Sequence, residues 1–206
     1  TPVPLIRSDS YTTLMDATKT LSHWEGAEWQ VVMMADEVVF IGGPSGVGKS
    51  SVGLEMHAQL SAADVSHCVI DGDFLDMAYP TPWEHGLAER NLAAIWANYR
   101  ALGYTRLIYT NTVSVLPTVM QALLDAMGGN VEAVAVLLTC TEDTARQRLT
   151  QREKGSALNR QIELSTQMAV ALEATCPSTV HRVPTDTCSI QSVAAAVIRL
   201  TGWLPG

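Results

Sequence analysis

The pattern of apolar and polar residues changes period repeatedly after residue 36. Short apolar runs typical of buried strands alternate with longer segments whose apolar residues recur every three or four positions. The runs predict five strands, at Val38–Ile41, His67–Ile70, Arg106–Tyr109, Val131–Leu138 and Val180–Val183. The longer segments predict helices at Ser51–Leu60, Leu87–Leu102, Val115–Met127, Thr141–Arg152, Leu158–Ala174 and Ser189–Thr201. Strands joined by helices predict an α/β fold, a three-layer α/β/α sandwich around a mostly parallel five-stranded sheet.

Residues 1–36 lie outside this alternation and are predicted to form an N-terminal extension to a main domain at 37–206. The extension holds four apolar residues spaced for one face of a short helix: Leu14, Ala17, Leu21 and Trp24. Such an extension can pack on the domain or on a second subunit, so a homodimer is compatible with the sequence.

Composition and charge narrow the partners that we expect. The chain has 206 residues and a net charge of −8, which argues against nucleic acid, because phosphate backbones attract clustered Lys and Arg. No apolar run approaches the length of a membrane span, so we expect no membrane partner. The four cysteines, Cys68, Cys140, Cys176 and Cys188, show no C-x-x-C spacing. We interpret them as reduced thiols of a cytoplasmic protein.

One glycine-rich motif gives the strongest functional signal. The stretch from Gly43 to Ser50 reads G-x-x-x-x-G-K-S, a complete P-loop, and it stands between a predicted strand and a predicted helix. Backbone N–H groups of such a loop and the helix N-terminus bind phosphate. The motif therefore predicts ATP and Mg²⁺ as cofactors, with Lys49 at the β- and γ-phosphates and the Ser50 hydroxyl on Mg²⁺. The predicted nucleotide-binding residues are Gly43, Ser45, Gly46, Val47, Gly48, Lys49, Ser50 and Ser51.

Two carboxylates follow the second predicted strand. Asp71 and Asp73 are separated by Gly72, and the end of this strand is expected to face the P-loop. A carboxylate there can accept a proton from a substrate hydroxyl or order water around Mg²⁺. Alternatively, Asp73 caps a turn before a short helix.

The P-loop followed by a strand that ends in D-G-D-x-L resembles the small-molecule kinases among the P-loop NTPases. The closest parallels are adenylylsulfate kinases and gluconate kinases, and the resemblance covers most of residues 37–201. It implies that the carboxylate at this strand end lies beside the acceptor hydroxyl. We expect Asp71 to be the proton acceptor, with Asp73 as the alternative. The chain lacks the His-Pro and Asn pattern of gluconate kinases after D-G-D, so gluconate is not supported as the acceptor.

The region after D-G-D is where related kinases place the acceptor. Arg90 and Asn91 are similar to an Arg and nearby Asn of adenylylsulfate kinases, and Arg90 could clamp an anionic acceptor through two hydrogen bonds. Thr110 and Asn111 end the third predicted strand, where they either contact substrate or cap the following turn.

Basic residues follow the fourth predicted strand. Arg148 and Arg152 are four residues apart and share a helix face, in a run that resembles the R-L-x-x-R entry to a kinase lid at about 146–160. A lid arginine can neutralise the transferring phosphoryl group. We expect this role for Arg152, adenine stacking for Arg148, and a second substrate contact from Arg160. Asp186, in the loop after the last strand, is a candidate adenine contact.

The pattern as a whole predicts an ATP-dependent, Mg²⁺-dependent phosphotransferase that acts on a hydroxyl or similar group of a small molecule. One alternative is a nucleotide kinase. Another is a binding or switch protein with slow ATP hydrolysis, although a GTPase-type N-K-x-D is absent from the sequence.

Overall fold

The structure, a computed structural model, describes residues 35–152 and 158–204. The strands are β1 Asp36–Gly42, β2 Cys68–Asp71, β3 Arg106–Thr110, β4 Val131–Thr139 and β5 His181–Pro184. The helices are α2 Lys49–Ala62, α3 Leu87–Ala101, α4 Pro117–Ala126, α5 Glu142–Arg152, α6 Leu158–Thr175 and α7 Ile190–Thr201, with 3₁₀ turns η1 Gly72–Phe74 and η2 Trp83–His85. The helix predicted for the N-terminal extension lies outside the described residues.

The five strands form one sheet in the order β2-β3-β1-β4-β5, and every neighbouring pair is parallel. The register places Ile41 of β1 beside Thr110 of β3 and Val136 of β4. The strand order reverses beside β1, and open α/β sheets bind ligands at the carboxyl ends of strands at such a point.

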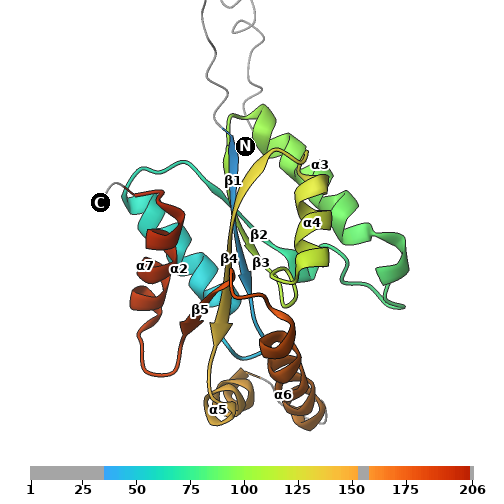
Figure 1. The fold of residues 1–206 in the computed structure, drawn as a ribbon, viewed down its shortest axis with the longest axis vertical. Helices are drawn as coiled ribbons and strands as arrows, with labels where there is room; N and C mark the ends of the chain where they lie inside the picture. The colour runs from blue at the N-terminus through green and yellow to red at the C-terminus, as the bar shows by residue number, and fades with distance from the viewer. Residues whose placement is uncertain (1–34, 153–157, 205–206) are drawn as a thin grey trace, which may run out of the picture. The chain divides into compact units, whose positions relative to one another are not determined.

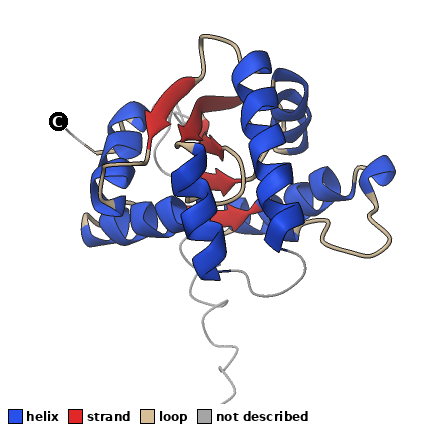
Figure 2. Cartoon of the chain, turned by 90° about the horizontal axis from the view of Figure 1, so that it is seen from below, coloured by secondary structure: helices blue, strands red, loops and turns tan. Residues whose placement is uncertain are grey.

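Helices cover both faces of this sheet (Figure 1). α2 and α7 lie on one face, and α3 and α4 lie on the other. α5 and α6 lie beyond the carboxyl ends of the strands, which Figure 2 views from below. The predicted α/β/α sandwich is therefore confirmed, and the sheet is entirely parallel.

Alternate side chains of the sheet supply two separate cores. Val38, Phe40 and Leu107 point toward the α3 and α4 side, whereas Val39 and Ile108 pack with α2 and α7. All five side chains are at most 1% exposed. A strand that is buried on both faces reads as a continuous apolar run, which explains why β1 could be located from its sequence.

Local capping residues fix several helix ends. The Ser189 hydroxyl accepts a hydrogen bond from the Ser192 N–H at 3.2 Å and caps α7. Gly103 follows α3 with φ 89°, a left-handed conformation that favours glycine. α4 starts at Pro117 and not at Val115, because proline has no N–H to donate and suits the first helical turn. No described helix is long and apolar enough to cross a membrane.

Leu60 and Leu54 provide a matched pair of substitutions on the two faces of α2. Leu60 is 0% exposed in the core, whereas Leu54 is 62% exposed. We expect Leu60→Ala to lower the free energy of unfolding by about 2–5 kcal/mol, because it leaves a cavity. Leu54→Ala should change it by about 0.5 kcal/mol or less. Urea denaturation measures both values, and equal losses would contradict this packing.

Candidate functional site

The P-loop connects β1 to α2 at the carboxyl edge of the sheet. Its glycines Gly43, Gly46 and Gly48 have φ of 141°, 83° and 106°, which residues with a Cβ rarely adopt. A Cβ on Gly46 would also lie 3.0 Å from the carbonyl oxygen of Ala145. The first N–H groups of α2 have no partner within the helix, so they are available to an anion.

Lys49 is buried at the start of α2 and folds back over the loop. Its Nζ donates hydrogen bonds to the carbonyl oxygens of Gly43 at 2.9 Å and Pro44 at 3.4 Å. Burial lowers the pKa of the Lys49 ammonium, while the nearby carboxylates of Asp73 and Asp71 act in the opposite direction. A phosphate oxygen can compete for the ammonium, because carbonyls are weaker partners than an anion.

Asp71 joins the end of β2 to the start of α2. Its Oδ2 accepts a hydrogen bond from the Ser50 hydroxyl at 2.7 Å, and its Oδ1 accepts one from the Asp73 N–H at 3.1 Å. Hydroxyl and carboxylate oxygens are the donor set that Mg²⁺ prefers beside phosphates. These residues therefore fit the ion that the P-loop implies. Among the described residues no group of three or more His, Cys, Asp or Glu could hold a metal by itself.

Asp73 lies two residues after Asp71, within η1, and its side chain is bound by the residue that follows β3. Its Oδ1 accepts a hydrogen bond from the Asn111 amide at 2.8 Å. Burial raises the pKa of the Asp73 carboxyl, whereas Lys49 and Asn111 partly oppose that rise. Gly72 permits this turn, since a Cβ there would collide with the hydroxyl of the buried Tyr109.

A cavity of about 520 Å³ opens over the P-loop. Its lining combines the loop with both carboxylates and two arginines of α5: Ser45, Gly46, Gly48, Lys49, Ser50, Ser51, Asp71, Asp73, Phe74, Met77, Arg148, Leu149, Arg152 and Gln161. Arg152 lies close enough to Lys49 to lower the pKa of its ammonium. Two cations facing one cavity favour an anion between them.

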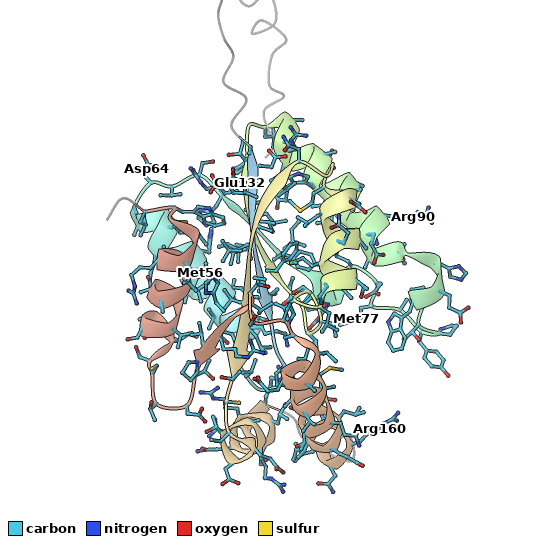
Figure 3. The ribbon with its side chains drawn as sticks, viewed as in Figure 1. Met56, Asp64, Met77, Arg90, Glu132 and Arg160 are labelled. Atoms are coloured by element: carbon cyan, nitrogen blue, oxygen red, sulfur yellow. The ribbon has the colours of Figure 1, made fainter. Side chains whose placement is uncertain are left out.

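A second cavity, of about 710 Å³, lies between η1, α3, α4 and α6. Its lining residues are Asp73, Asp76, Met77, Ala78, Thr81, Trp83, Leu87, Ala88, Glu89, Tyr109, Asn111, Thr112, Val113, Val119, Leu123 and Met168. Asp73 and Met77 line both cavities. Figure 3 shows Met77 near the lower end of α4, close to α6. Asp73 therefore stands at the boundary between the P-loop cavity and this second cavity.

Arg148 ties the P-loop to the loop after β5. Its guanidinium donates to the carbonyl oxygens of Val47 at 3.1 Å and Thr185 at 2.7 Å, and to the Thr185 hydroxyl at 2.9 Å. A third cavity, of about 250 Å³, lies beside it and is lined by Gly48, Ser51 and Cys188 among others. Arg148, for which the sequence predicted adenine stacking, is itself among the residues that line this cavity.

Asp186 makes its described contacts within the protein. Its Oδ1 accepts hydrogen bonds from the Thr141 N–H at 2.8 Å and the Thr141 hydroxyl at 2.7 Å, just before α5. These bonds lower the pKa of the Asp186 carboxyl. The residue fixes the entry to α5 and is not among the lining residues of the three cavities.

Four predicted substrate contacts lie outside the three cavities. Arg90 and Arg160 are exposed and point away from the sheet in Figure 3. The Asn91 amide donates to the carbonyl oxygen of Leu75 and so fixes the segment after η1. Thr110 is 1% exposed, and its methyl lies 2.9 Å from where a Cβ on Gly53 would stand.

The range predicted for the lid, residues 146–160, includes the end of α5 and the start of α6. Residues 153–157 of this range lie outside the described residues.

Sequence reasoning did not identify several residues that the fold brings to the site. Thr185 acts as the partner of Arg148, and Asp76 and Glu89 add two carboxylates to the second cavity. Glu89 precedes Arg90 in the acceptor segment, so a helix-face analysis of α3 could have found it. Thr185 carries no local signal, because its partner is 37 residues away in the chain.

No protein-family model and no curated protein matches the chain. Solved structures do match. The tunicamycin resistance protein of Deinococcus radiodurans aligns with a TM-score of 0.56 and 18% identity, over 81% of this chain and 96% of that one. The APS kinase of Mycobacterium tuberculosis, in complex with AMPPNP and APS, aligns with a TM-score of 0.52 and 21% identity, over 81% and 97%. Shikimate kinase from Acinetobacter baumannii, in complex with shikimate, aligns with a TM-score of 0.52 and 10% identity, over 81% of this chain and 93% of that one.

These identities are low, so the likeness concerns the fold and leaves the substrate open. Together with the P-loop at the carboxyl end of β1, it bears out the fold that the resemblance in the sequence implied. The chain shares this fold with solved structures that include an APS kinase and a shikimate kinase.

Proposed function

We propose that this chain is an ATP-dependent phosphotransferase that moves the γ-phosphoryl group to a hydroxyl, or a similar acceptor group, of a small molecule. The observation that carries the proposal is the position of Asp73, which lines both the P-loop cavity and the second cavity, where we place the acceptor and which we call the acceptor cavity. A group that reaches both cavities can contact an acceptor oxygen while ATP occupies the loop.

The nucleotide half of the proposal follows from the charges around the P-loop. The N–H groups of the loop and of the α2 N-terminus bind the phosphates, and Lys49 exchanges its carbonyl partners for phosphate oxygens. Arg152, at the edge of the same cavity, adds charge opposite the transferring group. Adenine occupies the third cavity beside Arg148. The Ser50 hydroxyl and Asp71 would hold Mg²⁺, which would supply positive charge to the phosphates when bound.

The two carboxylates have different surroundings, and this supports different roles. Asp71 accepts a hydrogen bond from the Ser50 hydroxyl, which supports a role for Asp71 beside Mg²⁺. Asp73 faces the acceptor cavity, is oriented by Asn111, and has a raised pKa that makes it a better proton acceptor near neutral pH. We therefore assign the base role to Asp73 in preference to Asp71.

The transfer balances through these groups. The acceptor oxygen forms a bond to the γ-phosphorus, the bond between that phosphorus and the β,γ-bridging oxygen breaks, and ADP leaves. The hydroxyl proton passes to Asp73. Because the transition state is loose, positioning and cation placement contribute more than the strength of the base.

Acceptor-dependent release of ADP tests the proposal. ATP and Mg²⁺ are incubated with the full chain and a panel of sugars, sugar acids, nucleosides, nucleotides, amino alcohols and amino acids, and mass spectrometry detects phosphorylated product. We expect Lys49→Ala to lower the rate by about 10²-fold or more, the scale of losing one preorganised electrostatic contact. ATP binding without acceptor-dependent turnover across the panel would instead favour a binding or switch protein.

Substitution of each carboxylate separates their roles. Asp73→Asn should abolish most transfer while nucleotide binding persists, because the amide neither accepts the proton nor positions the acceptor hydroxyl as the carboxylate does. Asp71→Asn should raise the Mg²⁺ concentration needed for half-maximal rate, since Ser50 loses its partner. Steady-state kinetics with titrated Mg²⁺ measure both effects. Exchange of these two phenotypes would return the base role to Asp71.

Asn111 tunes the pH dependence of the proposed base. Activity requires ionised Asp73, so the rate should rise as the pH passes through the pKa of this carboxyl. Burial raises that pKa above the value of an ordinary aspartate, so this acidic limb of the pH profile lies at higher pH. The Asn111 hydrogen bond favours the ionised form. Its removal in Asn111→Ala should raise the pKa of Asp73 and move the limb to higher pH. A pH profile of kcat that shifts the other way, or not at all, would argue against Asp73 as the base.

A further inference from the structure

The acceptor cavity is lined by carboxylates and by no cation among the described residues. Asp73, Asp76 and Glu89 contribute three carboxylates, and no Lys, Arg or His is among the described residues that line it. Asp76 and Glu89 form no ion pair with any described residue. Arg90, which the sequence predicted to clamp an anionic acceptor, points away from the sheet in Figure 3. An anionic acceptor would meet repulsion here.

The same charges act on the buried Tyr109 hydroxyl, which lies against the cavity. Burial raises the pKa of Tyr109, and the carboxylates of Asp73, Glu89 and Asp76 add to the rise. The carboxylates therefore converge on one volume from η1, the segment after it and α3.

The rest of the lining is apolar and partly open to solvent. Met77 and Trp83 are 67% and 74% exposed, and Met168, Val119 and Leu123 close the cavity from α6 and α4. An exposed indole beside carboxylates is a favourable surface for an organic cation. The volume of about 710 Å³ is in the range that holds a drug-sized molecule.

We infer that the acceptor is an amphipathic amino alcohol, a molecule with a reactive hydroxyl, a protonated amine and an apolar body. The hydroxyl lies at Asp73, the ammonium lies between Asp76 and Glu89, and the apolar body packs on Trp83, Met77 and Met168. This inference rests on the proposed function and names the substrate class of its acceptor site. A nucleoside monophosphate fits it poorly, because no described cation of the cavity would pair with the phosphate.

Binding of matched probes tests the charge preference without turnover. On each of three hydroxyl scaffolds, aromatic, alicyclic and branched aliphatic, the set contains an amine, its N-acetyl derivative and the corresponding carboxylate. The aromatic set is 2-amino-3-phenylpropan-1-ol, its N-acetyl derivative and 2-benzyl-3-hydroxypropanoate. Ligand-observed NMR with the full chain gives the dissociation constants. We expect the amine to bind most tightly on at least one scaffold.

Removal of the two carboxylates should weaken that binding. The double variant Asp76→Asn/Glu89→Gln should lose about fivefold or more in affinity for the amine and little for the neutral probe. Glu84→Gln is the matched control, since it lies in η2 and does not line the cavity. Equal or tighter binding of the neutral or carboxylate probes, no binding on any scaffold, or unchanged affinity in the double variant would overturn the inference.

A separate readout of the nucleotide site keeps the two proposals distinguishable. Cys188 is exposed and lines the third cavity, whereas the other three cysteines are buried or half-buried. ATP should slow the alkylation of Cys188 if adenine binds there. Protection together with turnover of an anionic acceptor would refute the amine preference and leave the phosphotransferase intact. Loss of ATP protection and of all acceptor-dependent turnover would undermine the proposed function itself.

Discussion

A short chain of hydrogen bonds connects three elements at the carboxyl edge of the sheet. The Ser50 hydroxyl donates to Asp71, Asp71 accepts the Asp73 N–H, and the Asn111 amide donates to Asp73. These hydrogen bonds fix the start of α2 relative to the ends of β2 and β3. The parallel register makes this possible, because Asp71 and Thr110 are paired and bring the two strand ends to the same level. Without that constraint the two carboxylates would have no defined position beside the P-loop.

The sequence predicted the parts of the fold that depend on local signals. The P-loop, the apolar run of β1 and the Ser189 cap each carry their information within a few residues. Contacts between distant segments were not predictable in this way. Arg148 was expected beside adenine, and in the structure its guanidinium also holds Val47 and Thr185, 101 and 37 residues away. Periodicity placed Arg148 on a helix face but could not show which loops that face would meet.

The side chains after D-G-D illustrate the same limit. Arg90 and Asn91 are adjacent on α3, so they diverge by about 100° around the helix. Asn91 turns inward to the carbonyl oxygen of Leu75, and Arg90 turns outward. The neighbour that does reach the cavity is Glu89, which reverses the charge expected for the pocket. A one-residue difference in helical phase therefore changes the charge that a molecule in this cavity would meet.

The two cavities differ in their charged residues, and Asp73 lies on their boundary. The P-loop cavity combines Lys49, Arg148, Arg152 and the α2 N-terminus with Asp71 and Asp73, whereas the second cavity has carboxylates and no cation among its described lining residues. Such a difference would orient a substrate that carries an ammonium, since the charged end is drawn away from the cations of the P-loop. Its hydroxyl then remains at the boundary, beside the γ-phosphate. Asp76 and Glu89 would contribute to catalysis through this orientation, because even a weak ion pair with the ammonium would hold the reacting oxygen beside the γ-phosphate.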